Sequence, residues 1–248
     1  MNQTTIDVQL SSGLKTIAQT SMEVADTLIM LAKSHPDFQK WSISVKKNEY
    51  FDVLSYNNTE EFAKELSVAF IKSWSGNIRK YNKGLKVVTE DFSDNVGHSY
   101  TFVYKKSKDN EYVVDFQLGA DPSLFCDRIR IKLPKDDWYT CQWTKDVLCH
   151  LIDYFDVTYG GLLPSYYLRF EHRVYRMLSI YPGWINYFPN EAELPDMSDY
   201  EVVEDYKGKV KIYTLQKDEI DRLSRDQCRK WLYTYKKIAV KFGVPRNE

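Results

Sequence analysis

Four stretches of the chain repeat apolar residues every three or four positions, the spacing that places them on one face of an α-helix. They are Leu14–Ala32, a segment that begins at Thr59, Gln142–Phe155 and Ser224–Phe242. Two glutamates directly follow Thr59, where negative charge suits the positive end of a helix dipole. The sequence therefore predicts four helices.

Between these helices apolar and polar residues alternate, which is the pattern of half-buried β-strands. The predicted strands are Trp41–Val45, Tyr100–Tyr104, Glu111–Leu118, Arg128–Leu133, Tyr166–Tyr175, Trp184–Phe188, Tyr200–Glu204 and Lys209–Leu215, with a turn at Gly208 between the last two. The strands near residues 100–133 form an antiparallel meander with one solvated face, and the helix Gln142–Phe155 covers its dry face. Three basic residues are predicted on the solvated side: Arg128, Arg130 and Lys132. They are either simply solvated or bind a phosphate or an acidic partner.

The predicted fold class is α+β, with antiparallel sheets covered by helices. A chain of 248 residues fits a single domain over residues 1–248. Strands followed by a covering helix occur twice, so two similar lobes, 1–160 and 161–248, are the arrangement left open.

Composition narrows the class of protein. The formal net charge is -1, so no overall field draws the chain to nucleic acid. The cysteines show neither the density of a disulfide framework nor the paired spacing of a zinc site: Cys126, Cys141, Cys149 and Cys228. No signal peptide opens the sequence, and no stretch approaches the roughly 18 apolar residues of a membrane span. We expect a cytoplasmic protein with reduced thiols.

Candidate catalytic residues are few. The four histidines are far apart, and Cys149 and His150 point about 100° apart on a helix, so they cannot form a nucleophile–base pair. Nucleophile-elbow, Walker and dinucleotide-binding patterns are absent. The sequence predicts no catalytic residue, no metal site and no cofactor.

One pattern supports an enzymatic alternative. Pro195-Asp196 followed by Asp205-Tyr206-Lys207 matches the PD…DxK pattern of restriction-endonuclease-like nucleases. In such enzymes two carboxylates hold a metal ion and a lysine supports the attacking water. Here Lys207 adjoins the predicted turn at Gly208, where its side chain points into solvent, which weakens this interpretation.

An acidic segment lies between residues 190 and 205 and contains no lysine or arginine. Its acids are Glu191, Glu193, Asp196, Asp199, Glu201, Glu204 and Asp205. Concentrated negative charge speeds association with a basic partner and can imitate nucleic acid in a binding groove. A solvated loop without a partner is the simpler explanation of the same residues.

The stretch before this segment, Tyr181-Pro-Gly-Trp-Ile-Asn-Tyr-Phe-Pro189, carries a family resemblance. Its Gly183-Trp184-x-x-Tyr187 core with a trailing proline, and the order of elements from about Asp127, resemble the immunity protein 52 family of bacterial polymorphic-toxin systems. That resemblance implies a non-enzymatic cytoplasmic protein that binds and neutralises a toxin, often a nuclease, delivered by type VI or related secretion.

The predicted partner-binding residues are the acids of the segment and two aromatic side chains expected to be exposed beside it: Glu191, Glu193, Asp196, Asp199, Glu201, Trp184 and Tyr187. A tryptophan after glycine in a strand is also a common core anchor, and this alternative is kept for Trp184. The predicted partner is a toxin protein, with no membrane and no direct nucleic acid. A homo-oligomer, and a scaffold or adaptor role, stay open.

Overall fold

The protein is described by a computed structural model over residues 4–11, 13, 15–43, 50–81, 98–107, 110–119, 127–134, 140–164, 184–189, 194, 196–208 and 210–214. Its contacts divide the chain into two units. The inserted unit comprises residues 11–129, and the terminal unit comprises residues 1–10 and 130–248. Both contain antiparallel strands and helices, so the predicted α+β class is confirmed.

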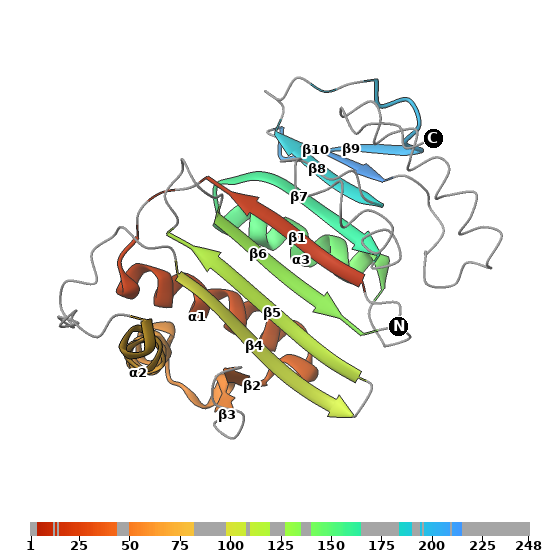
Figure 1. Ribbon diagram of the computed structural model, residues 1–248. Coiled ribbons are helices and arrows are strands. Elements are labelled where there is room, and N and C mark those ends of the chain that lie inside the picture. Colours follow the sequence, from red (N-terminus) through yellow and green to blue (C-terminus); the bar gives the residue numbers. More distant parts are fainter. Residues whose placement is uncertain are drawn as a thin grey trace, which may run out of the picture. The chain divides into compact units, whose positions relative to one another are not determined.

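Two helices of the inserted unit match the predictions closely. Helix α1 (Ile17–Ser34) begins with a capping box, in which the Thr16 side chain accepts from the Gln19 backbone and Gln19 accepts from the Thr16 backbone. Helix α2 (Thr59–Tyr81) begins at the predicted residue. The two helices pack on each other, as Figure 1 shows in red and orange. Their apolar faces are buried: Val24, Leu28 and Leu66 have no exposed surface.

The strands of the inserted unit are ordered β3-β2-β4-β5. They span Lys40–Ile43 (β2), Tyr50–Asp52 (β3), His98–Ser107 (β4) and Asn110–Leu118 (β5), with short 3-10 turns at Pro36–Phe38 and Val53–Ser55. Strands β4 and β5 pair antiparallel as the predicted meander requires. An aromatic core joins helix to sheet, since Phe70 of α2 stacks on Tyr100 of β4 and lies edge-on to Phe102.

The described residues of the terminal unit form six strands in the order β6-β1-β7-β8-β10-β9, and the division between the units falls within β6. The strands span Thr4–Leu10 (β1), Asp127–Leu133 (β6), Val157–Pro164 (β7), Ile185–Pro189 (β8), Val202–Tyr206 (β9) and Val210–Thr214 (β10). Helix α3 (Cys141–Tyr154) packs on β7 and β1 and lies across one face of them in Figure 1. The turn between β9 and β10 lies at Gly208, as predicted, where Lys207 and Gly208 both have positive φ.

Two expectations need correction. Strands β1 and β7 were absent from the sequence prediction, although every residue of β1 is buried. Helix α3 packs on these two strands, whereas the prediction placed it on the meander. The single domain over residues 1–248, and the two lobes left open beside it, stay predictions. The predicted strand Tyr166–Tyr175 and helix Ser224–Phe242 lie outside the described residues.

Candidate functional site

The acidic segment is described from residue 196 onward, and there three of its five acidic side chains are exposed. Asp196 and Glu201 are exposed, and Asp199 is partly exposed. Asp196 also organises the backbone, since its carboxylate accepts hydrogen bonds from the Ser198 N–H at 3.0 Å and the Ser198 hydroxyl at 2.9 Å. Glu191 and Glu193 lie outside the described residues. The described part of the segment is therefore a negatively charged surface.

Trp184 and Tyr187 are buried, each with 4% of its surface exposed. The backbone N–H of Trp184 donates to the Leu162 carbonyl oxygen, and the Tyr187 hydroxyl donates to the Val157 carbonyl oxygen. Burial raises the pKa of Tyr187. The expectation that these rings are exposed is wrong, because β8 lies between β7 and β10 and both of its faces are covered. They anchor the core, and we leave them out of the proposed interface.

Strand β9 follows the acidic segment and presents two different rows of side chains. Val202, Glu204 and Tyr206 are half-buried, while Val203 and Asp205 are exposed. This alternation is the period of a strand with one covered and one solvated face. Val203 has 52% of its surface exposed and lies between the exposed acids Glu201 and Asp205. The exposed row thus continues the acidic surface and adds an apolar position to it.

The covered row of β9 is held by α3. Glu204 forms an ion pair with Lys145 near the start of the helix. Asp153 near its end accepts from the Tyr206 hydroxyl at 2.8 Å and from the Lys207 ammonium at 2.6 Å. The hydrogen bond from Lys207 lowers the pKa of Asp153, and the same bond raises the pKa of Lys207. We call these five residues the α3–β9 clamp.

Cys149 lies between Lys145 and Asp153 on α3, and its thiol is half-buried. Burial raises the pKa of the Cys149 thiol, although nearby Lys145 opposes the change. A reactive cysteine needs a lowered pKa and access to solvent. His150 is exposed on a different side of the helix, as the spacing predicts. This thiol therefore has the surroundings of a structural cysteine.

The residues of the nuclease pattern have separate local roles. Asp196 caps Ser198, Asp205 accepts from the Gly208 N–H at 2.9 Å, and Lys207 pairs with Asp153. Within the described parts of the chain, no group of three histidine, cysteine or acidic side chains is arranged to hold a metal ion.

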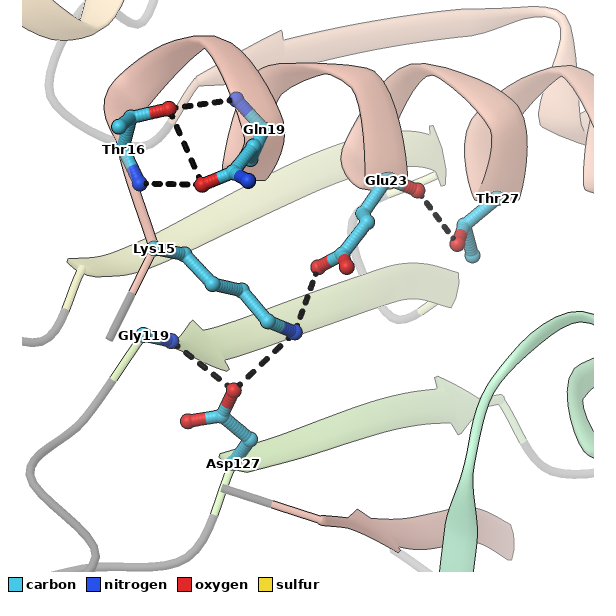
Figure 2. A network of polar contacts seen from close by, with 7 residues as sticks. All are labelled: Lys15, Thr16, Gln19, Glu23, Thr27, Gly119 and Asp127. Carbon is cyan, nitrogen blue, oxygen red and sulfur yellow. Dashed lines mark hydrogen bonds and ion pairs between the residues drawn. The ribbon is translucent and has the colours of Figure 1, made fainter. Parts of the chain in front are cut away.

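A second polar centre lies in the inserted unit, and Figure 2 shows it. The Lys15 ammonium lies 2.9 Å from the Glu23 carboxylate and 3.3 Å from the Asp127 carboxylate. Asp127 is fully buried and also accepts from the Gly119 N–H at 2.9 Å. We call these four residues the buried lysine network. It joins the start of α1 to the end of β5 and the start of β6, which is a structural role.

The basic row of β6 is half-buried and alternates with buried apolar residues as predicted. Its Arg130 lies 3.3 Å from Asp7 of β1, whose side chain is 3% exposed. The guanidinium therefore compensates a buried carboxylate within the terminal unit. Arg130 therefore has a structural role, whereas the sequence analysis placed its side chain on a solvated face.

The sequence analysis did not identify Lys145 and Asp153, which belong to the α3–β9 clamp, or Val203, which lies in the exposed row of β9. The first two are polar positions of an amphipathic helix, and nothing in the local sequence shows which strand they face. Val203 fell within a predicted strand, but only the structure shows that its side chain points outward. The alternation of apolar and polar residues along the strand was the available sequence signal for Val203. The position of α3 is needed to tell which row of side chains is covered.

Comparison with known proteins leaves the family open. No protein-family model matches the chain, and no curated protein matches it. A solved structure described as "Pseudomonas aeruginosa T6SS protein PA0821" aligns with 11% sequence identity and a TM-score of 0.45, covering 96% of this chain and 73% of that one. Such a likeness carries no conclusion about function, and the resemblance to the immunity protein 52 family stays a prediction. In the described part of the chain, no helix combines the length and apolar character needed to cross a membrane.

Proposed function

We propose that this chain is a non-catalytic immunity protein that binds and neutralises a secreted bacterial toxin inside the producing cell. The observation that carries the proposal is the exposed row of β9 and the acidic residues before it, with Val203 set among Glu201 and Asp205. An apolar side chain amid exposed acids suits a protein partner that is basic around a small apolar contact. The family resemblance supplies the expectation that this partner is a toxin.

Several features of the surface favour binding over catalysis. The thiol of Cys149 is half-buried with a raised pKa, and the residues of the nuclease pattern are occupied in local contacts. The acidic surface, in contrast, has the charge needed to steer a basic partner into place. Because such steering is screened by ions, association should slow as salt is raised.

The toxin encoded beside this gene is the reagent for the test. We expect the purified toxin to bind the wild-type protein, and Glu201→Lys to weaken that binding about tenfold, because the substitution replaces an attraction by a repulsion. Glu60→Lys is the matched control, since Glu60 is equally an exposed acid but lies in the inserted unit. It changes the net charge identically and should bind like the wild type.

Three results would contradict the proposal. Equal affinity of Glu201→Lys and the wild type would remove the acidic surface from the interface. The absence of any secreted toxin in the neighbouring reading frames would favour a scaffold or adaptor role. Magnesium-dependent cleavage of plasmid DNA by the pure protein, lost in Asp205→Asn, would establish the nuclease alternative.

A further inference from the structure

We propose that the toxin binds by adding an extended segment to the edge of β9, so that the sheet of the terminal unit continues into the partner. This inference rests on the proposed function and specifies how that binding occurs. It also specifies the chemistry of the partner segment, which alternates basic and apolar residues.

The backbone of β9 is arranged to accept a further strand. Among the strands that the structure describes, β9 is the last in the order and pairs with β10 alone, antiparallel from Val202 to Tyr206. In such a strand every second residue directs its N–H and C=O groups away from its neighbour. These groups can form ladder hydrogen bonds with an incoming extended segment, a recognised mode of peptide binding.

The α3–β9 clamp keeps this edge in place before the partner arrives. Glu204 is tied to Lys145, and Tyr206 and Lys207 are tied to Asp153, so the strand is attached to the helix at two points about two turns apart along α3. A strand fixed in its bound conformation loses little conformational entropy on binding. Within β9 the clamp engages only Glu204 and Tyr206 of the covered row, and it leaves Val203 and Asp205 facing solvent.

The exposed row determines which segment fits. Residues directly opposite each other on one face of a sheet are in contact, so the partner must place its side chains against Val203 and Asp205 of β9 and against Glu201, one residue before the strand. Carboxylates at the two ends favour lysine or arginine, and the central valine favours an apolar or β-branched residue. The expected partner segment therefore reads basic-x-apolar-x-basic in an extended conformation.

Amide hydrogen exchange of the isotope-labelled full chain, alone and bound to the toxin encoded beside its gene, tests this inference. Addition of a strand should slow exchange at alternate residues between Glu201 and Tyr206 by at least about tenfold, because those amides gain ladder hydrogen bonds. Chain pairing protects every second amide, whereas a side-chain contact alone produces no such alternation.

A pair of matched substitutions tests the apolar position. Val203→Lys puts a positive charge at the centre of the exposed row, and we expect it to weaken toxin binding at least about tenfold. Val68→Lys in α2 is the control, because Val68 is 50% exposed and Val203 is 52% exposed. The control should bind normally, and both variants should unfold at the denaturant concentration of the wild type.

The outcomes separate this inference from the function on which it rests. Toxin binding with alternating protection in β9 supports both. Toxin binding with unchanged exchange in β9, or with full affinity in Val203→Lys, overturns the strand addition and leaves the immunity role standing. Absence of toxin binding overturns the immunity role, and the strand addition with it.

Discussion

The two polar centres of this chain use the same side chains in opposite surroundings. In the buried lysine network, the ammonium of Lys15 forms an ion pair with the carboxylate of Asp127, whose side chain has no exposed surface. In the α3–β9 clamp, Lys207 and Asp153 are 59% and 37% exposed at their side chains. The two ion pairs therefore have different energetic consequences, because solvent screens the second pair more strongly than the first, in which the Lys15 side chain is 18% exposed and that of Asp127 is buried.

The difference separates a structural role from a positioning role. A buried carboxylate must be paired, since the loss of its partner leaves an uncompensated charge in a medium of low dielectric constant. An exposed pair contributes little to global stability, although it can still hold one strand against one helix. We infer that the network maintains the inserted unit, while the clamp fixes the shape of a surface without being essential for folding.

Replacing each lysine by methionine gives the largest contrast. Lys15→Met should lower the free energy of unfolding by about 3 kcal/mol, because it leaves Asp127 buried beside an apolar side chain. Lys207→Met should leave the midpoint of chemical denaturation unchanged within error. Denaturation curves of the two variants and the wild type at neutral pH provide the measurement.

The comparison would fail if the two variants were destabilised equally. It would also fail if Asp127→Asn, combined with Lys15→Met, were no more stable than Lys15→Met alone. The double variant removes the stranded charge, so it should recover part of the lost stability.

Two glycines with nearly the same backbone conformation extend the comparison. Gly119 has φ of +70° and Gly208 has φ of +68°. A Cβ atom at Gly119 would lie 3.2 Å from the Lys15 Cβ, whereas one at Gly208 meets nothing within 4 Å. Gly208→Ala should therefore cost about 1 kcal/mol for the left-handed conformation alone, and Gly119→Ala about 2 kcal/mol. Equal losses in denaturation experiments would show that the network tolerates displacement of Lys15.

The sequence predicted the elements whose signals are local. Helices α1, α2 and α3, the β4–β5 pair and the turn at Gly208 were all expected from periodicity and caps. Strand β1 was missed although Ile6, Val8 and Leu10 alternate with polar residues, and the structure shows that its polar positions are buried as well. Strand β7 contains Gly160 and Gly161, which are typical of turns, and its pairing with β1 depends on residues about 150 positions away.

The candidate site was predictable only in part. The negative charge of the segment was evident from composition, and the structure shows Asp196 and Glu201 exposed. The aromatic residues were assigned to the surface because local pattern does not distinguish an interior strand from an edge strand. Strand order makes that distinction, and it places Trp184 beside the interior strand β8 and Val203 on β9. Long-range pairing therefore decides which of two neighbouring motifs can contact a partner.

The smallest expected effect is a difference in the sign of pH dependence between the two centres. Burial raises the pKa of Glu23 above its ordinary value of 4.5, although Lys15 opposes the change. Folding thus favours protonated Glu23, and its contribution to stability is fully present below 4.5 and lost as the pH rises through the raised pKa. Asp153 behaves oppositely, because its lowered pKa makes its contribution present above 3.8 and lost as the pH falls through the folded-state value.

Difference curves of unfolding free energy against pH separate these two contributions. Relative to Glu23→Gln, which keeps an acceptor for Lys15, the wild type should lose stability as the pH rises above 4.5 and through the raised pKa of Glu23. Relative to Asp153→Asn, it should lose stability only below about pH 4, and by a smaller amount because that pair is exposed. Curves of the same sign would mean that burial does not dominate the titration of Glu23, and the distinction between a buried network and an exposed clamp would then lose its electrostatic basis.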